Sequence, residues 1–243
     1  RFSERLVRAM SDIRPIDKPK AVERPTEALA EMAAGVAHEL NNPLSVISGR
    51  AQLLAENEAD EERRRDLQQI QDNVDEATGV IDDLMAFAEP SRPKPTRTPV
   101  RQIIEEAVEL AGQKSKVDHV NVQVQSIGAD AEVLVDSAQV VSALANVLSN
   151  AIESYTDPAG PIKICAEPGA DGIMLQVRDL GCGMDAETLR KATHPFFSAK
   201  PAGRKRGMGL AYAARLIQLN GGTLALASVP NQGTTVTVTL PCE

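Results

Sequence analysis

The clearest periodicity in the chain runs from residue 67 to residue 88. Its apolar residues alternate spacings of three and four, and they are Leu67, Ile70, Val74, Ala77, Ile81, Leu84 and Ala88. This alternation places them in one stripe along a helix, as in a coiled coil or a helical bundle. Residues 27–57 are rich in Ala, Leu and Glu and space their apolar side chains in a similar way. They therefore predict a preceding helix.

The connection between these two helices is short and strongly charged. Residues 60–66 read DEERRRD, which predicts a solvated turn followed by a helix start. Two helices joined by so short a connection form an antiparallel hairpin. Because a single hairpin cannot cover its own apolar stripe, we expect two copies to pair into a four-helix bundle.

The pattern changes after Glu89, where prolines at 90, 93 and 95 end the second helix, since each lacks a backbone donor and restrains its predecessor. Thr98 and Pro99 are predicted to cap the next helix, and Asp136 a longer one. Helices are predicted at 100–112 and 136–154, and strands at 120–124, 133–135, 162–166, 173–179, 223–227 and 234–240. These elements indicate an α+β sandwich, with helices backing one face of a sheet. The predicted organisation is a lead-in linker at 1–25, a helical hairpin at 26–89, a linker at 90–98 and the α+β domain at 99–243.

Composition narrows the possible functions. The 243 residues are 42% hydrophobic but only 2% aromatic, so the core must be aliphatic and base stacking is disfavoured. The net charge of −8 disfavours duplex nucleic acid as a partner. Three cysteines argue against a disulfide framework and fit a reducing compartment. No apolar run is long enough to span a membrane and no secretory signal is present, so we expect a cytoplasmic location, with any membrane anchor upstream in a longer parent.

The first candidate for chemistry is His38, in the run HELNNP at 38–43. It lies off the apolar stripe of its helix, so its imidazole is expected to face solvent, where it would be a competent nucleophile. Glu39 could orient the ring, and Asn42 lies about one turn further on the same face. Pro43 frees a helical carbonyl and allows a bend beside the histidine. An ordinary surface histidine is the competing interpretation.

Two asparagines form a second candidate, on the predicted helix at 136–154. Asn146 and Asn150 are spaced i, i+4, which puts both amides on one helical face, where their oxygens could hold Mg²⁺ bridging phosphates. Glu153 could support them from behind. Polar residues on a solvated face, or satisfied core amides, would give the same spacing.

A third candidate, DLGCG at 179–183, directly follows a predicted strand. The glycines Gly181 and Gly183 allow the backbone to approach a ligand closely, and Asp179 could accept a hydrogen bond from an exocyclic amine such as that of adenine. A tight turn without a ligand is an equally good interpretation of this segment alone.

The fourth candidate is Gly207-Met208-Gly209-Leu210, which opens an apolar helix. Backbone N–H groups at a helix N-terminus can hold phosphate oxygens. Lys200 and the run Arg204-Lys205-Arg206 lie just upstream, and cations beside a glycine turn in an acidic protein suggest a polyphosphate ligand. The intervening Pro-Ala-Gly makes a mobile lid plausible, and a solvated loop is the alternative.

In this order and spacing the segments resemble the transmitter region of a sensor histidine kinase, over about residues 27–240. They resemble, in turn, its H box (38–43), N box (146–151), first glycine box (179–183), F box (Phe196 and Phe197) and second glycine box (207–210). The runs HELNNP and PFFSAKP resemble the nitrogen-regulation-type branch. Two departures appear at the second glycine box: Met208 stands where Leu is more usual, and Lys205-Arg206 where Gly-Thr commonly opens the motif.

The resemblance implies a dimeric hairpin plus an ATP-binding sandwich of the gyrase, chaperone, histidine kinase and MutL type. It implies ATP-dependent phosphorylation of His38, with Glu39 as base or orienter, and transfer to an aspartate of a response regulator. It also implies that Asn42 supports the reverse dephosphorylation. ATP and Mg²⁺ would be held by residues already named together with the F box: Asn146, Asn150, Asp179, Gly181, Gly183, Phe197, Lys200, Arg204, Gly207, Gly209 and Leu210, with Asn146 and Asn150 as the metal ligands.

Two other functions remain to be weighed against this one. A hydrolytic clamp ATPase of the same fold carries a glutamate where this chain has Asn146, and an amide cannot act as a general base. A catalytically silent dimerisation scaffold would need only the hairpin, but the histidine, asparagine and glycine motifs are intact. The predicted protein is therefore a protein-histidine kinase.

Overall fold

The computed structural model describes residues 24–115, 117, 121–127, 131–155, 160–169, 172–199 and 207–242. The side chains of residues 24–36, 38, 126 and 127 are outside this description. Among the described residues, no helix has both the length and the apolar character that a membrane span requires.

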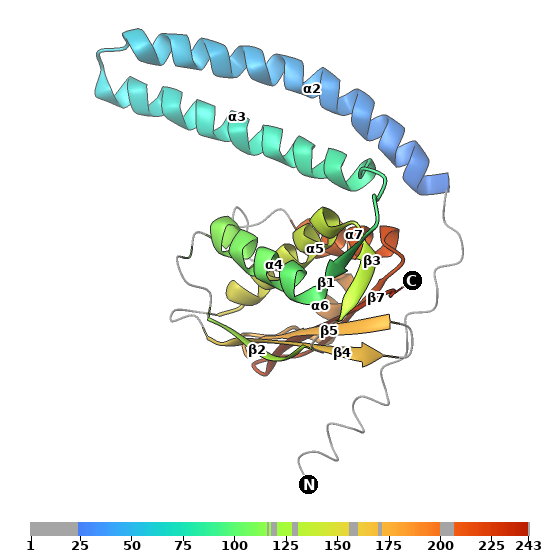
Figure 1. Cartoon of the computed structure of the whole chain (residues 1–243). Coiled ribbons are helices and arrows are strands. Elements are labelled where there is room, and N and C mark those ends of the chain that lie inside the picture. The colour runs from blue at the N-terminus through green and yellow to red at the C-terminus, as the bar shows by residue number, and fades with distance from the viewer. Residues whose placement is uncertain are drawn as a thin grey trace.

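Two long helices form the predicted antiparallel hairpin (Figure 1). Helix α2 spans Arg24–Asn57 and continues through Pro43, and α3 spans Glu61–Ala88. Asp60 caps α3, because its Oδ1 accepts from the Glu62 N–H at 2.8 Å and the Arg63 N–H at 3.4 Å. This satisfies two of the donors that a helix start leaves without partners. The charged run is therefore a turn and a helix start, as predicted.

The hairpin covers only part of its apolar stripe. Ala51 of α2 and Val74 and Ile81 of α3 are buried. Large apolar side chains of the same two helices remain more than 40% exposed, and these are Leu40, Val46, Ile47, Leu53, Leu54 and Ile70. The hairpin thus has an apolar face that it does not bury within its own chain.

After the proline-containing segment, a short strand appears where the sequence predicts linker and helix cap. Strand β1 (Thr96–Pro99) pairs antiparallel with β3 (Glu132–Val135), with Thr98 opposite Val133. The prediction of a helix cap at 98–99 was wrong because the nearby prolines suggest an irregular segment, while the pairing partner of this strand lies far along the chain. Pro99 is tolerated because it ends a strand in a two-stranded sheet.

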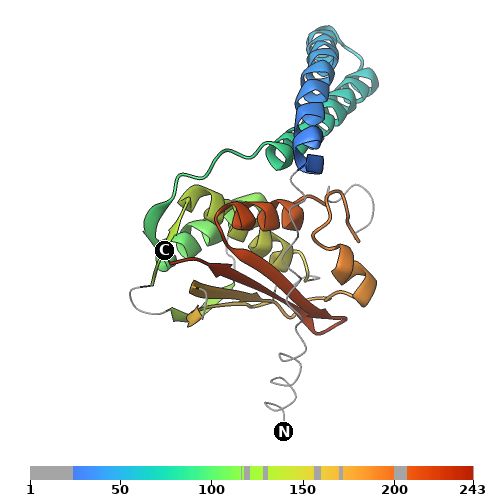
Figure 2. The same cartoon turned by 90° about the vertical axis from the view of Figure 1, so that its right-hand side faces the viewer.

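A five-stranded sheet forms the larger layer of the C-terminal part. Its strands lie in the order β2 (Val122–Ile127), β4 (Ile162–Gly169), β5 (Gly172–Arg178), β7 (Gly233–Leu240) and β6 (Thr223–Val229). Only β2 and β4 pair in parallel. The helices α4 (Val100–Ser115), α5 (Ser137–Ile152) and α7 (Gly209–Leu219) cover one face of the sheet (Figure 2). The predicted one-sided sandwich is confirmed.

The core lies between that sheet and its helices and is aliphatic, as the composition requires. Alternate residues of the central strands point inward, such as Ile164 of β4, Leu175 of β5 and Val238 of β7, each no more than 2% exposed. They belong to one buried cluster with Ile103 of α4 and Leu148 of α5. This cluster fixes α5 and α7 over the sheet, and the functional residues lie at the ends of those helices.

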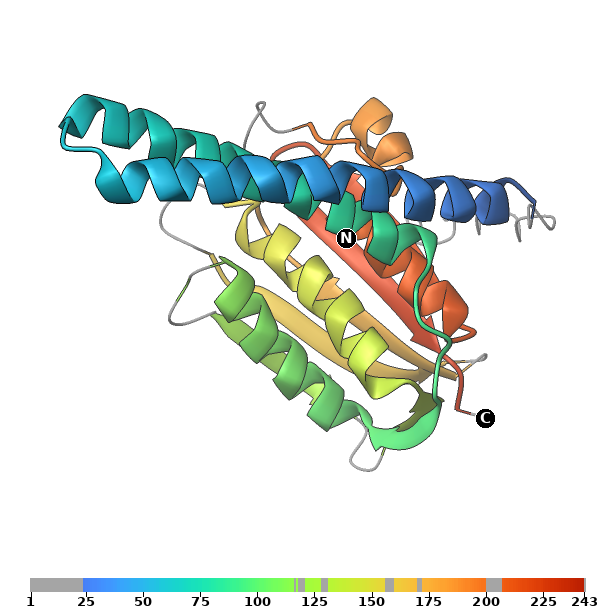
Figure 3. The same ribbon diagram turned by 90° about the horizontal axis from the view of Figure 1, so that it is seen from above.

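The hairpin lies over the helical layer (Figures 1 and 3). Helix α3 contacts α7, whereas α2 lies on the far side of α3. The residues at 38–43 are therefore separated from the α+β domain by α3 in this chain.

Candidate functional site

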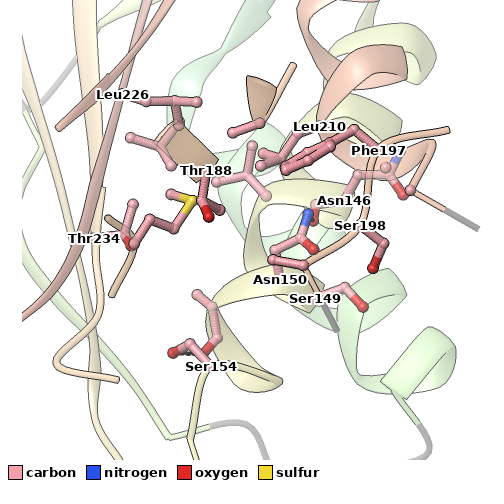
Figure 4. Close-up of a pocket in the computed structure, with 18 of the residues that line it drawn as sticks. Asn146, Ser149, Asn150, Ser154, Thr188, Phe197, Ser198, Leu210, Leu226 and Thr234 are labelled. Carbon is pink, nitrogen blue, oxygen red and sulfur yellow. Dashed lines mark hydrogen bonds between the residues drawn. The ribbon is translucent and has the colours of Figure 1, made fainter. Parts of the chain in front are cut away.

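A cavity of about 990 Å³ opens between the helical layer and the loops that follow β5. Asn146, Ser149 and Asn150 enter it from α5, and Thr188 enters it from the short helix α6 (Ala186–Lys191) (Figure 4). Helix α3 contributes Glu76, Asp83 and Ala86 to the rim. The cavity brings together most of the predicted site residues: Asn146, Asn150, Asp179, Gly183, Phe197, Gly207, Gly209 and Leu210.

Asp179 stands at the inner end of this cavity and is 4% exposed. Its Oδ1 accepts from Ser154 Oγ at 3.0 Å, the Gly181 N–H at 2.9 Å and the Thr234 N–H at 3.2 Å. Among the described residues, all three of these donors point to Oδ1 and none to Oδ2. One oxygen therefore anchors the carboxylate, and the other can accept a hydrogen bond from a ligand.

The glycine turn after Asp179 is required by close backbone packing. Gly183 has φ +64°, and a Cβ there would overlap the carbonyl oxygen of Val229. Only glycine adopts this conformation at that spacing without strain. Gly181 does not line the cavity, but its N–H helps to hold Asp179 in place.

The two asparagines share one face of α5, as the i, i+4 spacing predicts. Asn150 Nδ2 donates to the backbone carbonyl of Asn146 at 2.9 Å, which leaves its Oδ1 as the free end of the amide. Asn146 Oδ1 accepts from Lys114 Nζ at 3.0 Å. Amide oxygens are suitable ligands for Mg²⁺ when waters and phosphates supply the rest of its coordination. The described residues contain no cluster of three or more His, Cys, Asp or Glu side chains that could hold a metal.

Helix α7 directs its N-terminus at the same cavity. Its N-cap residue, Met208, makes no side-chain capping hydrogen bond, so the first N–H groups of the helix keep their capacity to bind an anion. Gly209 lies against the Asn150 amide, because a Cβ at this position would be 3.3 Å from Asn150 Nδ2. The expected phosphate-binding turn and the expected metal ligand are therefore neighbours.

The F box supports this turn from outside. Gly207 has φ +70°, and a Cβ there would overlap the carbonyl oxygen of Phe197. Phe197 lines the cavity, with Lys191 Nζ 5.8 Å from its ring centroid. Phe196 is 52% exposed and points away from the core. Phe197 thus serves the cavity, and neither phenylalanine belongs to the buried core.

Several contacts at the cavity have no counterpart in the sequence motifs. Lys114 of α4 lines the cavity. Beside it, Ser115 of α4 and Ser149, a residue within the N box, have their Oγ atoms 2.9 Å apart and join α4 to α5. Ser149 also donates to Glu153 at 3.2 Å, so Glu153 reaches the site through a serine. Nothing in the local sequence signals these contacts, because each joins two different elements or a motif residue to its neighbour.

Two ionisable groups near the cavity have shifted pKa values. Burial raises the pKa of the Tyr212 phenol above its ordinary 10.0, and the Asp83 carboxylate of α3 raises it further. The Thr188 backbone N–H and hydroxyl lower the pKa of Asp185 below 3.8. The first shift reflects the approach of α3 to α7, and the second reflects the cap of α6.

The predicted catalytic residues Glu39 and Asn42 lie outside the cavity. His38, Glu39 and Asn42 belong to α2, and the side chains of Glu39 and Asn42 are exposed. The imidazole of His38 and the predicted phosphate ligands Lys200 and Arg204 lie outside the described residues.

The fold and the cavity define a class of protein. A one-sided α+β sandwich holds a buried aspartate, a pair of asparagines and an open helix N-terminus around one cavity, and this combination is suited to a nucleotide. Two family models match the chain. Residues 135–243 match the histidine kinase-, DNA gyrase B- and HSP90-like ATPase, and residues 28–92 match the His Kinase A (phospho-acceptor) domain. The chain is a histidine kinase transmitter region.

Curated relatives agree with this assignment. The signal transduction histidine-protein kinase AtoS of Escherichia coli strain K12 is 32% identical over 220 residues, which cover 88% of this chain and 35% of AtoS. The sensor histidine kinase ZraS of the same strain is 29% identical over 215 residues, covering 88% of this chain and 46% of ZraS. The chain thus spans less than half the length of either relative.

Solved structures show the same fold. Full-length ShkA in complex with AMPPNP aligns with a TM-score of 0.69 at 21% identity, covering 87% of this chain and 45% of ShkA. ThkA in complex with the response regulator protein TrrA aligns with a TM-score of 0.61 at 22% identity, covering 88% of this chain and 61% of that chain.

Proposed function

We propose that the protein phosphorylates His38 with ATP and then transfers the phosphoryl group to an aspartate of a response regulator. The observation that carries this proposal is the cavity, in which the buried Asp179, the Asn146–Asn150 pair and the α7 N-terminus converge. The same chain matches a phospho-acceptor domain over residues 28–92.

Recognition of the adenine base falls to Asp179. Its Oδ1 is held by three donors, so the carboxylate is rigid before the ligand arrives. Oδ2 accepts from the exocyclic amine of adenine, Gly183 allows the base to approach the backbone, and Gly181 contributes by holding Asp179. A rigid acceptor in a buried site favours adenine over guanine, which presents an oxygen at that position.

The phosphates lie at the other end of the cavity. The N–H groups of Gly207, Gly209 and Leu210 at the start of α7 bind phosphate oxygens. Asn150 and Asn146 would hold Mg²⁺ through their amide oxygens, and the bound ion would offset the charge of the phosphates. Phe197 supports the turn, and Lys200 and Arg204 provide further positive charge.

The transfer itself is a displacement at phosphorus. A nitrogen of the His38 imidazole forms a bond to the γ-phosphorus, while the bond from that phosphorus to the β,γ-bridging oxygen breaks and ADP leaves with the electron pair. Glu39 orients the ring and accepts its second N–H proton. Phosphohistidine then donates to the carboxylate of the regulator. Asn42, one turn from His38, positions a water for the reverse dephosphorylation of the regulator.

The geometry of this chain limits how transfer can occur. Helix α3 lies between α2 and the helical layer of the α+β domain (Figure 1) and contributes to the cavity lining, and the described α2 makes its main contacts with α3. The α+β domain must therefore move relative to the hairpin through the segment that follows α3, or the acceptor histidine must come from a second chain.

The chain is organised as a lead-in at 1–25, a dimerisation and phosphotransfer hairpin at 26–89, a linker at 90–98, whose last three residues belong to β1, and a catalytic domain at 99–243. The exposed apolar face of the hairpin supports homodimer formation. The response-regulator partner is supported by ThkA, whose structure was solved in complex with one. We infer a cytoplasmic location for this region, and the runs HELNNP and PFFSAKP support the nitrogen-regulation-type branch.

One labelling experiment tests the proposal. The protein is incubated with Mg²⁺ and ATP labelled at the γ-phosphate, as wild type, His38→Gln and Asn150→Ala. We expect an acid-labile label on the wild type and none on either variant, since one lacks the acceptor and the other a metal ligand. Steady release of free phosphate that survives His38→Gln would instead indicate an ATPase. The absence of nucleotide binding in the wild type would indicate a scaffold.

A further inference from the structure

Lys114 is a charged residue of the cavity that no sequence motif marks. It lies in the last turn of α4, lines the cavity and donates from Nζ to Asn146 Oδ1 at 3.0 Å. The neighbouring Ser115 pairs with Ser149 of α5 at 2.9 Å. The end of α4 is thus fastened to the face of α5 that carries both asparagines, and the lysine is held at that face.

The charge balance of the cavity gives this lysine its importance. Four carboxylates contribute to the described lining, from Glu76, Asp83, Asp179 and Asp185. Among the described lining residues, Lys114 is the one that carries a positive charge. A triphosphate brings about four negative charges and is bound only where cations or oriented donors offset them. The described wall therefore supplies one cation to a strongly anionic ligand.

The sequence at the end of α5 strengthens this assignment. The turn after Asn150 carries Glu153, which accepts from Ser149 and adds negative charge near the asparagines. A cation beside the phosphates must therefore come from another element, and α4 is the element whose end packs on this face of α5.

We propose that Lys114 binds a phosphate oxygen of ATP, and that its ammonium leaves the Asn146 amide oxygen when that oxygen becomes a ligand of Mg²⁺. This inference rests on the proposed function and adds a substrate-binding residue to it. An ammonium and a divalent cation repel each other at one oxygen, so loading of the metal with ATP displaces the lysine. The flexible four-carbon stem lets the ammonium move from the amide to the phosphates without a change in the backbone.

If Lys114 contacts the phosphates, its replacement should weaken the binding of ligands that carry phosphates and leave the binding of adenosine unchanged. Lys114→Met removes the charge and keeps an apolar stem of similar length. We expect its affinity for Mg²⁺·ATP to fall about 10- to 100-fold, as for loss of one charged hydrogen bond. Its affinity for adenosine should change by less than about twofold, because Asp179 and the base pocket are untouched. Lys114→Arg should retain most of the ATP affinity.

Lys163→Met is the matched control. This lysine lies on β4 and does not line the cavity, so the same chemical change there should leave ATP and adenosine affinities as in the wild type. Titration calorimetry of all four proteins with ATP, ADP and adenosine in Mg²⁺ gives the comparison.

The outcomes separate this inference from the proposed function. If the wild type binds ATP and becomes labelled on His38 while Lys114→Met binds ATP equally well, the lysine does not contact the phosphates. Equal losses for ATP and adenosine would also overturn the inference, because they would show a structural role at the α4–α5 contact. If the wild type binds no ATP, the proposed function itself fails.

Discussion

The two parts of this chain bury their apolar residues to very different extents. In the α+β domain, Leu148, Ile164 and Leu175 are at most 2% exposed and belong to one closed cluster. On the α2–α3 hairpin, Ile47 is 45% and Leu54 is 61% exposed, although both lie on the predicted seam.

The difference shows which part is complete within one chain. The α+β domain has a sheet and a helical layer that cover each other, so its stability should not depend on protein concentration. The hairpin has an apolar face that the described residues of its own chain leave exposed, and a second copy of the same hairpin would extend the seam into a four-helix bundle. Four predictions test this contrast, beginning with the largest effect.

The largest expected effect is the loss of dimer affinity when a charge is placed on the exposed apolar face of the hairpin. Ile47→Glu should raise the Kd of the homodimer by about 100-fold or more, because burial of one such side chain is worth about 1.5–3 kcal/mol and the change occurs in both copies. Sedimentation equilibrium of wild type and variant measures it. Gln52→Glu adds the same charge to α2 and should leave the Kd nearly unchanged. If both variants raised the Kd equally, the cause would be charge repulsion between the two copies and not the loss of an apolar contact.

The core of the α+β domain should lose stability whatever the concentration. Leu148→Ala deletes a fully buried side chain and should lower the free energy of unfolding by about 2–5 kcal/mol. Urea unfolding at two protein concentrations measures the loss of unfolding free energy and shows whether that loss depends on protein concentration. Val124→Ala, at a position 49% exposed on β2, should cost less than about 1 kcal/mol. A concentration-dependent midpoint for this domain would contradict the contrast.

Loss of a buried polar contact should destabilise the α+β domain less than loss of a core side chain. Asn220, just after α7, accepts from the Asp136 N–H at 2.7 Å and donates to Gln139 Oε1 at 2.9 Å. Asn220→Ala should destabilise the domain by about 1–3 kcal/mol, since it leaves buried groups at the start of α5 without partners. The exposed Gln218→Ala in α7 should change stability by less than about 0.5 kcal/mol. Similar melting temperatures for the two variants would show that the contact contributes little.

The smallest effect should be a pH-dependent one at the cap of α6. The pKa of Asp185 is lowered in the folded chain by the Thr188 N–H and hydroxyl, so the charged cap stabilises the fold above the unfolded pKa. That contribution should be lost as the pH falls through the lower, folded pKa. Asp185→Asn keeps a capping oxygen that does not titrate. The melting temperature of the wild type should therefore fall more steeply in acid than that of the variant. Parallel curves of melting temperature against pH would show that titration of Asp185 does not contribute.

Local patterns predicted most of the fold and the centre of the site. The seam of α3, the strands of the sheet and the cap at Asp136 are all set by residues close in sequence. Asp179 and the Asn146–Asn150 pair were found for the same reason, because a turn after a strand and one face of a helix are local features. The strand β1 was missed, since its pairing with β3 depends on residues far apart in the chain.

Lys114 shows the limit of local patterns more clearly. It contacts Asn146 across 32 positions of sequence, and no spacing rule relates the end of one helix to the face of another. The position of α3 between α2 and the helical layer of the α+β domain is a second feature of this kind, because it depends on how the hairpin rests on α7.

The sequence by itself determined the elements and their chemistry: two seam-bearing helices, a sheet with helices on one face, and motifs at helix and strand ends. It could do so because periodicity, capping and turn formation act over a few residues. The tertiary structure decided which of those motifs share a cavity, which cation joins them and which apolar face remains uncovered. These features follow from the packing of distant segments, where burial and charge are set by neighbours that the local sequence does not name.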